Sequence, residues 1–368
     1  MKKYVPLLMF AFVLTGCSRA TIVLDPIPTT TPTPTVVFTP TSTVTPTVTP
    51  TLPPPPYAMY PYTLAGLRQR GYSGGKINLR KKLTITNIYT RWLIDYPSDG
   101  LTITGILQIP QGTSGQLPVI VLNHGYFNRW EYNSGDGTDR LAEVLNTSGY
   151  ITISSDYRGW GGSDMGLSFF YTGLAVDVLN LIASIPSIPQ ADPARVGMLG
   201  HSMGGGITSK VLAVDSGAHI RAAILYAPVS ADDADIIARW GFGCIGDGAI
   251  ATCYGADTIP DGVPTDLSDA YLKAASDPQL LRETSPIYHL DWINTPLQIH
   301  IGSADGQVIS AVPPEWSKKF YEALEKAGKP AQIFWYEDQA HSFIGDGRTL
   351  FLKRMVMFFD RLVKGPTE

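Results

Sequence analysis

The sequence predicts an α/β fold in which a mostly parallel central sheet has helices on both faces and carries a lid insertion. From about residue 57 onward, short apolar runs of strand type alternate with segments whose apolar residues recur at helical intervals. The run LPVIVL at residues 117–122 is continuously apolar, as in strands buried on both faces of a parallel sheet. Such alternation is typical of a parallel sheet between two layers of helices.

The predicted elements follow one another along the chain. Residues 83–96 and 101–110 alternate apolar and polar side chains and predict an opening pair of antiparallel strands. Further strands are expected at residues 117–125, 151–159, 194–199, 221–228, 295–302 and 331–337. Helices are expected at residues 140–150, 172–185, 205–214, 314–329 and 350–363.

The interval at about residues 229–286 interrupts this alternation. It is rich in glycine and aspartate and carries Trp240, Phe242 and Tyr254, so we expect a lid with aromatic walls. It also holds Cys244 and Cys253. An exported protein meets oxidising conditions, which favours a disulfide between them, with two buried free thiols as the alternative. Residues 57–368 are therefore predicted to form one domain with this lid.

The N-terminus has the pattern of an export signal. Lys2 and Lys3 precede an apolar stretch at residues 6–14 that is too short to span a bilayer. The following Leu-Thr-Gly-Cys at residues 14–17 resembles the lipobox of bacterial lipoproteins. The resemblance implies a lipoprotein signal peptide at residues 1–17 with lipidation of Cys17. An ordinary signal peptide with an incidental cysteine is the alternative.

A spacer is predicted between this signal and the folded domain. Residues 18–56 are rich in Thr and Pro, and residues 26–56 carry no charge. Proline fixes φ and removes a hydrogen-bond donor, so this tract favours disordered, extended polyproline II conformation. We expect a protein held through its lipid on the extracytoplasmic side of a bacterial membrane, in the cell envelope.

Charge and motifs argue against several classes of function. The formal net charge is −4, and no run of Lys or Arg follows the first three residues, so nucleic acid is not an expected partner. Neither a Gly-x-Gly-x-x-Gly phosphate loop nor a His-Glu-x-x-His zinc motif occurs. We expect neither a cofactor nor a metal.

The stretch RVGMLGHSMGGG at residues 195–206 is the first candidate for chemistry. Ser202 lies between Gly200 and Gly204, after a predicted strand and before a predicted helix. This is the strand, sharp turn and helix of a nucleophile elbow, which exposes the serine above the sheet. The amide of Met203, at the helix N-terminus, is expected to face a developing oxyanion.

A serine hydroxyl needs a base and an orienting carboxylate. His341 follows the last predicted strand, and Asp305 follows the strand before it. The chain order Ser202, Asp305, His341 is that of an α/β-hydrolase triad. Structural roles are expected for the histidines at positions 201, 219, 289 and 300, and surface or turn positions for the competing acids at positions 291 and 338.

Two further loops contribute to the predicted site. His124 and Gly125 precede Tyr126 after the strand at residues 117–125, so the amide of Tyr126 is the expected second oxyanion donor, with a purely structural turn as the alternative. On the next strand-to-helix loop, Asp156 and Arg158 are expected to brace the loop rather than to contact substrate.

These stretches resemble the α/β-hydrolase superfamily, and in particular the catalytic domain of prolyl oligopeptidase-type (S9-like) serine hydrolases. The matching motifs are LNHGY, DYRGWGGSD, DPARVGMLGHSMGGG, SPIYHLDWINTPLQIHIGSADGQV and FYEALEKAGKPAQIFWYEDQAHSF. The resemblance implies Ser202 as nucleophile, Asp305 as acid and His341 as base. Two departures are that residues 57–100 are too few for the family's β-propeller, and that Ile301 precedes Gly302 where the family often has histidine.

Together these features predict an exported, membrane-tethered serine hydrolase that forms an acyl-enzyme on Ser202. Its expected partner is a small-molecule ester or peptide. Ester cleavage is favoured, because esters have better leaving groups than amides and the lid offers no evident arginine clamp for a peptide carboxylate. An S9-like serine peptidase is the first alternative, and a non-catalytic binding protein on the same fold is the second.

Overall fold

The computed structural model describes residues 58–246, 248 and 255–365. The predicted signal peptide, Cys17 and the spacer, as well as Cys253 and Tyr254 of the predicted lid, lie outside these residues. Within the described part of the chain, no helix combines the length and apolarity that a membrane span requires.

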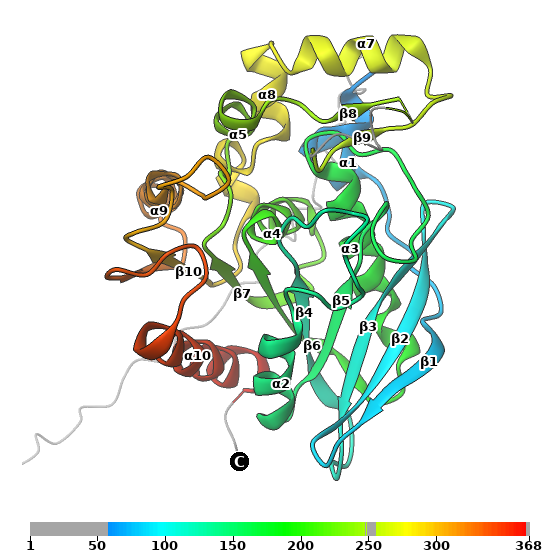
Figure 1. The fold of residues 1–368 in the computed structure, drawn as a ribbon, viewed down its shortest axis with the longest axis vertical. Coiled ribbons are helices and arrows are strands. Elements are labelled where there is room, and N and C mark those ends of the chain that lie inside the picture. The colour runs from blue at the N-terminus through cyan, green and yellow to red at the C-terminus, as the bar shows by residue number, and fades with distance from the viewer. Residues whose placement is uncertain (1–57, 247, 249–254, 366–368) are drawn as a thin grey trace, which may run out of the picture. The chain divides into compact units, whose positions relative to one another are not determined.

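A nine-stranded sheet forms the centre of the domain, with the order β1-β2-β3-β5-β4-β6-β7-β10-β11 (Figure 1). The pairs β1·β2, β2·β3 and β3·β5 are antiparallel, and every other neighbouring pair is parallel. The mostly parallel sheet is therefore confirmed. The strands are β1 Asn78–Ile85, β2 Tyr89–Ser98, β3 Leu101–Pro110, β4 Leu117–Asn123, β5 Ile151–Ser155, β6 Ala191–His201, β7 Ile220–Tyr226, β10 Leu297–Gly302 and β11 Ala331–Tyr336.

The predicted strand at residues 83–96 is wrong in its extent, because it combines the end of β1 with most of β2. The hydroxyl of Thr86 accepts hydrogen bonds from the amides of Ile88 (3.1 Å) and Tyr89 (3.0 Å), which turns the chain between the two strands. All of β1 is exposed, and its sequence NLRKKLTI offers no buried alternation. Its basic residues suit an edge strand, where charge discourages pairing with another chain.

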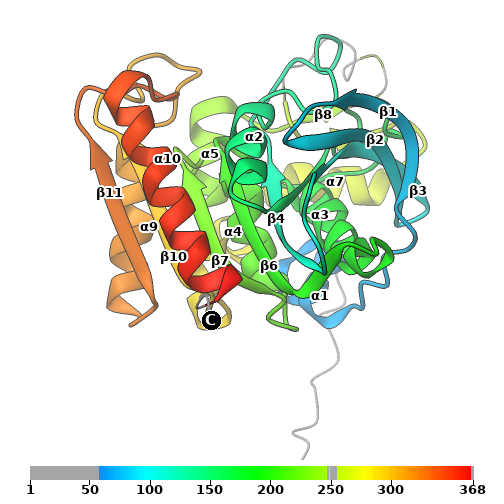
Figure 2. The same cartoon turned by 90° about the horizontal axis from the view of Figure 1, so that it is seen from below.

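Helices cover both faces of the sheet (Figure 2). Alternate residues of β4 divide between them: Val119 and Val121 pack in the cluster with α1, α3, α4 and α9, whereas Ile120 and Leu122 pack in the cluster with α2 and α10. These helices are α1 Leu64–Gln69, α2 Asp139–Thr147, α3 Thr172–Ser184, α4 Met203–Val214, α9 Pro314–Lys326 and α10 Gly345–Phe359. A strand that is apolar on both sides explains the continuous run of the sequence.

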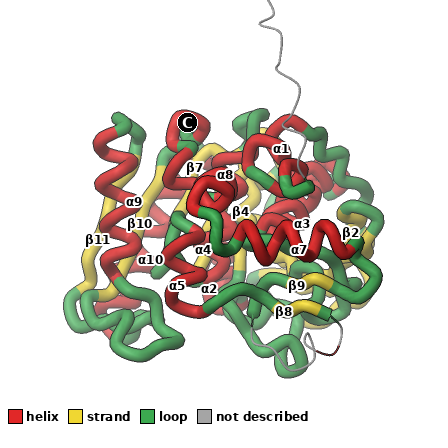
Figure 3. Tube along the Cα trace, turned by 90° about the horizontal axis from the view of Figure 1, so that it is seen from above, coloured by secondary structure: helices red, strands yellow, loops and turns green. Residues whose placement is uncertain are grey.

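The predicted lid is an insertion between β7 and β10 that lies beyond the carboxyl ends of the parallel strands, over α4 (Figures 1 and 3). Its described elements are α5 Asp233–Trp240, β8 Cys244–Ile245, β9 Thr258–Ile259, α7 Thr265–Ala274 and α8 Pro278–Thr284. Ser168, in the loop before α3, forms an isolated β-bridge with Thr258, so the insertion is joined to the rest of the domain through backbone hydrogen bonds.

Candidate active site

Ser202 sits between β6 and α4 in a strained backbone conformation, with φ 56° and ψ −121°. A non-glycine residue held in such a sparsely populated region costs roughly 1–3 kcal/mol, so its surroundings must enforce it. The amide of Ser202 donates to the carbonyl of Tyr226 on β7 (3.0 Å). The Ser202 carbonyl accepts from the amides of Gly205 (2.9 Å) and Val229 (3.0 Å). These bonds hold the sharp turn that the sequence predicts.

The two glycines that flank Ser202 allow backbones to touch. A Cβ on Gly200 would lie 2.1 Å from the carbonyl oxygen of Gly204, and a Cβ on Gly204 would lie 2.1 Å from the carbonyl oxygen of Asn123. Behind the serine, a Cβ on Gly125 would lie 3.2 Å from the Cβ of Ser202. Strand β6, helix α4 and the end of β4 therefore meet at distances that only glycine permits, and the loop after β4 packs tightly against the serine.

His341 and Asp305 are joined by a hydrogen bond at the same edge of the sheet. His341 Nδ1 lies 2.7 Å from Asp305 Oδ2. The other carboxylate oxygen of Asp305, Oδ1, accepts from the amides of Gly306 (2.7 Å) and Val312 (3.1 Å). Because the carboxylate accepts, Nδ1–H of His341 donates, so Nε2 is the ring nitrogen that can take a proton from a nucleophile. The sequence expected these residues on consecutive strand-end loops, and Asp305 rather than Asp291 or Asp338 receives the bond.

His201 connects the serine turn to the His341 loop. Its Nε2–H donates to the backbone carbonyl of His341 (3.1 Å), and the two imidazole rings are 4.8 Å apart between centroids. Burial, and then the charge on His341, lower the pKa of His201 to about 4, so this ring is neutral at neutral pH. The sequence predicted a role for His201 in the elbow but gave no signal for the contact with His341.

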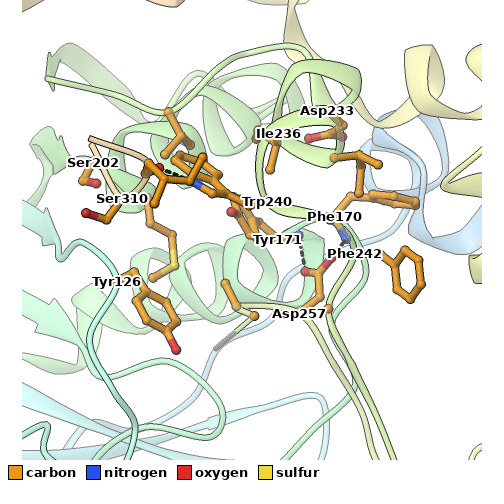
Figure 4. A pocket seen from close by; sticks show the side chains of 18 residues that line it. Tyr126, Phe170, Tyr171, Ser202, Asp233, Ile236, Trp240, Phe242, Asp257 and Ser310 are labelled. Atoms are coloured by element: carbon orange, nitrogen blue, oxygen red, sulfur yellow. Dashed lines mark hydrogen bonds between the residues drawn. The ribbon is translucent and has the colours of Figure 1, made fainter. Parts of the chain in front are cut away.

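The predicted oxyanion donors both lie beside Ser202. Met203 is the first residue of α4, where backbone N–H groups have no acceptor within the helix. Tyr126 follows the His-Gly pair after β4, and it lines the same cavity as Ser202 and Met203 (Figure 4). Both predicted donors therefore line one cavity with Ser202, and their roles as donors remain predictions.

The prediction that Asp156 and Arg158 brace the loop after β5 is confirmed. Asp156 is buried and accepts hydrogen bonds from Tyr132 (2.9 Å), Thr104 (2.6 Å) and Ser134 (2.5 Å). Arg158 forms a buried ion pair with Asp177 of α3, with Nη2 2.7 Å from Oδ1. Both side chains are occupied in holding the loop.

A cavity of about 500 Å³ opens beside Ser202 beneath the insertion (Figure 4). Its walls come from α5, from the loop before α3 and from the loop after β10, and they are mainly apolar and aromatic. Trp240 and Phe242 take part, as the sequence predicted. The lining residues are Tyr126, Phe170, Tyr171, Ser202, Met203, Val229, Asp233, Ile236, Ile237, Trp240, Gly241, Phe242, Gly243, Gly255, Ala256, Asp257, Ile309 and Ser310.

Asp257 fixes one wall of this cavity and was not predicted. Its carboxylate accepts from the amides of Phe170 (2.6 Å) and Tyr171 (2.7 Å) and from the hydroxyl of Tyr271 (3.0 Å). Phe170 and Tyr171 have positive φ values of 50° and 62°, so the carboxylate holds a strained turn. Burial raises the pKa of Asp257 to about 6. An aspartate in a glycine- and aspartate-rich insertion carries no local pattern that could have revealed this role.

Two further observations concern the predicted disulfide and metal binding. Cys244 is buried and disulfide-bonded. Its predicted partner Cys253 lies outside the described residues, so the pairing itself remains a prediction. Among the residues that the structure describes, no group of His, Cys, Asp and Glu side chains is arranged to hold a metal ion.

Two protein families match consecutive parts of the chain. The family described as serine aminopeptidase, S33, matches residues 117–247, and the dienelactone hydrolase family matches residues 253–356. The first match contains Ser202, and the second contains Asp305 and His341. A lysophosphatidylserine lipase of Xenopus tropicalis is 34% identical over 99 residues, which are 27% of this chain and 24% of that protein. The match therefore spans about a quarter of the curated relative's length.

Solved structures of esterases and peptidases share the fold. Acetyl xylan esterase 1 from Thermoanaerobacterium sp. is 18% identical, with a TM-score of 0.55 over 80% of this chain and 90% of that one. An acylaminoacyl peptidase of Pyrococcus horikoshii is 20% identical, with a TM-score of 0.55 over 77% of this chain and 43% of that one. Dipeptidyl peptidase 4 of Porphyromonas gingivalis is 21% identical, with a TM-score of 0.54 over 75% and 36%.

Proposed function

We propose that this chain, a serine hydrolase with the α/β-hydrolase fold, cleaves carboxylic esters through an acyl-enzyme on Ser202. The observation that carries the proposal is the His341–Asp305 hydrogen bond of 2.7 Å at the sheet edge where the strained Ser202 turn stands. His201, which directly precedes Ser202, contacts His341 through both its ring and a hydrogen bond.

Each residue of the site has a defined part in the proposed reaction. His341 takes the proton of the Ser202 hydroxyl as the oxygen attacks the ester carbonyl, and Asp305 stabilises the imidazolium that forms. The amides of Met203 and Tyr126 stabilise the negative oxygen of the tetrahedral intermediate. The alcohol then leaves with the proton from His341. Water, deprotonated by His341, attacks the acyl-enzyme, and the acid is released as the Ser202 oxygen takes that proton back from His341.

The cavity supports an ester with an apolar acyl or aryl group as substrate. Its walls include Tyr126, Tyr171 and Trp240, with Ile236 and Ile309 between them. Its two carboxylates are occupied: Asp233 pairs with Lys210 (2.8 Å), and Asp257 accepts backbone amides. The wall therefore presents apolar surface rather than open charges. The proposal also includes lipidation at Cys17, which rests on the lipobox-like sequence.

Removal of the nucleophile tests the proposal. Ser202→Ala should lower turnover of p-nitrophenyl esters by roughly 10⁴ to 10⁶, because the remaining histidine has no nucleophile to activate. Ser310→Ala is the matched control, since Ser310 lines the same cavity on the loop after β10, and it should retain most of the turnover. A fluorophosphonate probe should label the wild type and the control only. Near-native turnover of Ser202→Ala, or a wild type that the probe does not label, would contradict the proposal and favour a binding protein.

A pair of substrates with one acyl group decides between esterase and peptidase. An amide needs a well-placed proton on its departing amine, whereas an aryl ester leaves without one, so we expect kcat/KM on the ester to exceed that on the matched amide. The comparison uses an aminoacyl p-nitrophenyl ester and the corresponding p-nitroanilide. Equal or faster amide turnover would establish the peptidase alternative.

A further inference from the structure

The tip of the loop that carries Asp305 has little packing of its own. It leaves β10 at Gly302 and returns to α9 at Pro314, and residues 307–310 at its tip are exposed. Val308 and Ile309 are 61% and 67% exposed. Burial of apolar side chains therefore does not hold the tip in place, and other contacts must do so.

Two neighbouring residues at the end of α5 hold this loop by its carbonyl groups. Arg239 donates from Nη2 to Val308 O (2.8 Å) and from Nε to Ile309 O (3.2 Å). Its Nη2 also lies 3.5 Å from Gly306 O. Trp240 donates from Nε1 to Ile309 O (2.7 Å). The insertion thus contacts the loop at three of its backbone carbonyls.

An apolar cluster supports the same junction. Val312, which closes the loop on Asp305, packs with Val229 and Ile236 and with the indoles of Trp240 and Trp316. The two indoles meet edge to face, with centroids 5.3 Å apart. Residues from the insertion, the Asp305 loop and α9 are therefore packed as one unit.

The position of the loop decides the position of the carboxylate. Asp305 Oδ1 accepts from Gly306, at the start of the loop, and from Val312, at its end. A shift of the loop moves both donors and turns the carboxylate, and with it Oδ2, which holds His341. Shifts of about 1 Å in a supporting group can cost roughly 100-fold in rate.

We propose that Arg239 and Trp240 are positioning residues for the His341–Asp305 pair. The insertion would then align the Asp305 carboxylate as well as cover the cavity. The inference rests on the proposed function. Trp240, Ile309 and Ser310 also line the cavity, so a bound acyl group contacts the same junction that aligns Asp305.

Trp240→Phe tests the proposal, because phenylalanine keeps an aromatic wall and removes the indole N–H. We expect kcat on a p-nitrophenyl ester to fall roughly tenfold with KM nearly unchanged, and the double variant Arg239→Gln/Trp240→Phe to lose roughly 100-fold. The low-field proton signal of the His341–Asp305 hydrogen bond in ¹H NMR should broaden or shift in both variants. Trp316→Phe is the matched control, since Trp316 belongs to the same cluster but its indole has no hydrogen bond to the loop among the described residues.

Three outcomes would overturn the inference. One is a Trp240→Phe variant with the kcat of Trp316→Phe, and another is a loss confined to KM with an unchanged low-field signal, which would mean that Trp240 only lines the cavity. The third is a double variant no slower than its single variants. Each leaves Ser202→Ala inactive, whereas failure of the proposed function would leave Ser202→Ala active. The two failures are therefore distinguishable.

Discussion

The edge of the sheet formed by the carboxyl ends of its parallel strands, which carries Ser202, lines one cavity together with the insertion above it. Different interactions hold these two regions, and the first is called the sheet edge below. At the sheet edge, backbones approach one another so closely that glycine is required at positions 200 and 204. In the insertion, buried polar side chains connect segments that are distant in sequence. The first arrangement depends on local sequence, and the second on partners that only the folded chain brings together.

The Lys210–Asp233 pair shows how the insertion is attached. Lys210 on α4 is buried and donates from Nζ to both carboxylate oxygens of Asp233 on α5, at 2.8 and 2.9 Å. It also donates to the carbonyl of Thr284 at the end of α8 (2.6 Å). Loss of one partner of a buried pair typically costs about 3–5 kcal/mol, so these contacts strongly favour one position of α5.

The largest effect is expected at the sheet edge, from Gly204→Ala. The new methyl group would lie 2.1 Å from the carbonyl oxygen of Asn123, and neither backbone can move without separating β4 from α4. We expect a loss of on the order of 4 kcal/mol or more in the free energy of unfolding, together with loss of ester turnover. Urea unfolding followed by circular dichroism measures the first, and a p-nitrophenyl ester assay measures the second.

Gly71→Ala is the matched control for this substitution. Gly71 is exposed, and a Cβ there would have no heavy atom within 4 Å. Its free energy of unfolding should stay within about 0.5 kcal/mol of the wild type, as for ordinary surface substitutions. If both alanine variants unfolded at the same urea concentration as the wild type, the close backbone contact would not be what holds the sheet edge together.

Much of the sheet and the layout of its edge could be predicted because the signals are local. The apolar run of β4 and the glycines around Ser202 each reflect a constraint that acts within a few residues. The expected positions of Asp305 and His341 followed from the alternation of strands and loops, and the structure joins the two by a hydrogen bond. Parallel strands end at one edge, so residues after consecutive strands meet there.

The insertion could not be predicted in the same detail. Arg239 reaches a loop about 70 residues further along the chain, and Asp257 accepts amides from a loop more than 80 residues before it. Neither contact leaves a periodic pattern, since each depends on one side chain meeting one backbone segment. Strand β1, at one side of the sheet, was missed in part for a similar reason, because all of its residues are exposed and show no alternation of burial.

A smaller effect, with a pH dependence, is expected in the insertion from Asp257→Asn. Burial raises the pKa of Asp257 from 3.8 to about 6 in the folded protein, so the folded state binds a proton that the unfolded chain has already released. The resulting stability is fully present below about pH 4 and is lost as pH rises through 6. Two pKa units correspond to about 3 kcal/mol. Asparagine cannot ionise, so the stability of the variant does not have this pH dependence.

The measurement is the free energy of unfolding in urea for wild type and Asp257→Asn at pH 4, 5, 6 and 7. We expect the wild-type value, relative to that of the variant, to fall by about 2 kcal/mol between pH 4 and 7, because every other titrating group is common to both proteins and a small part of the change falls below pH 4. Asp266→Asn, at an exposed carboxyl in the same insertion, controls for the loss of one acidic residue. A fixed offset from the asparagine amide facing the Phe170 and Tyr171 amides does not affect this slope. A difference between wild type and Asp257→Asn that stays constant across the range would contradict this prediction. It would show that ionisation of the buried Asp257 carboxyl does not lower the free energy of unfolding, so that electrostatics would not distinguish the insertion from the sheet edge.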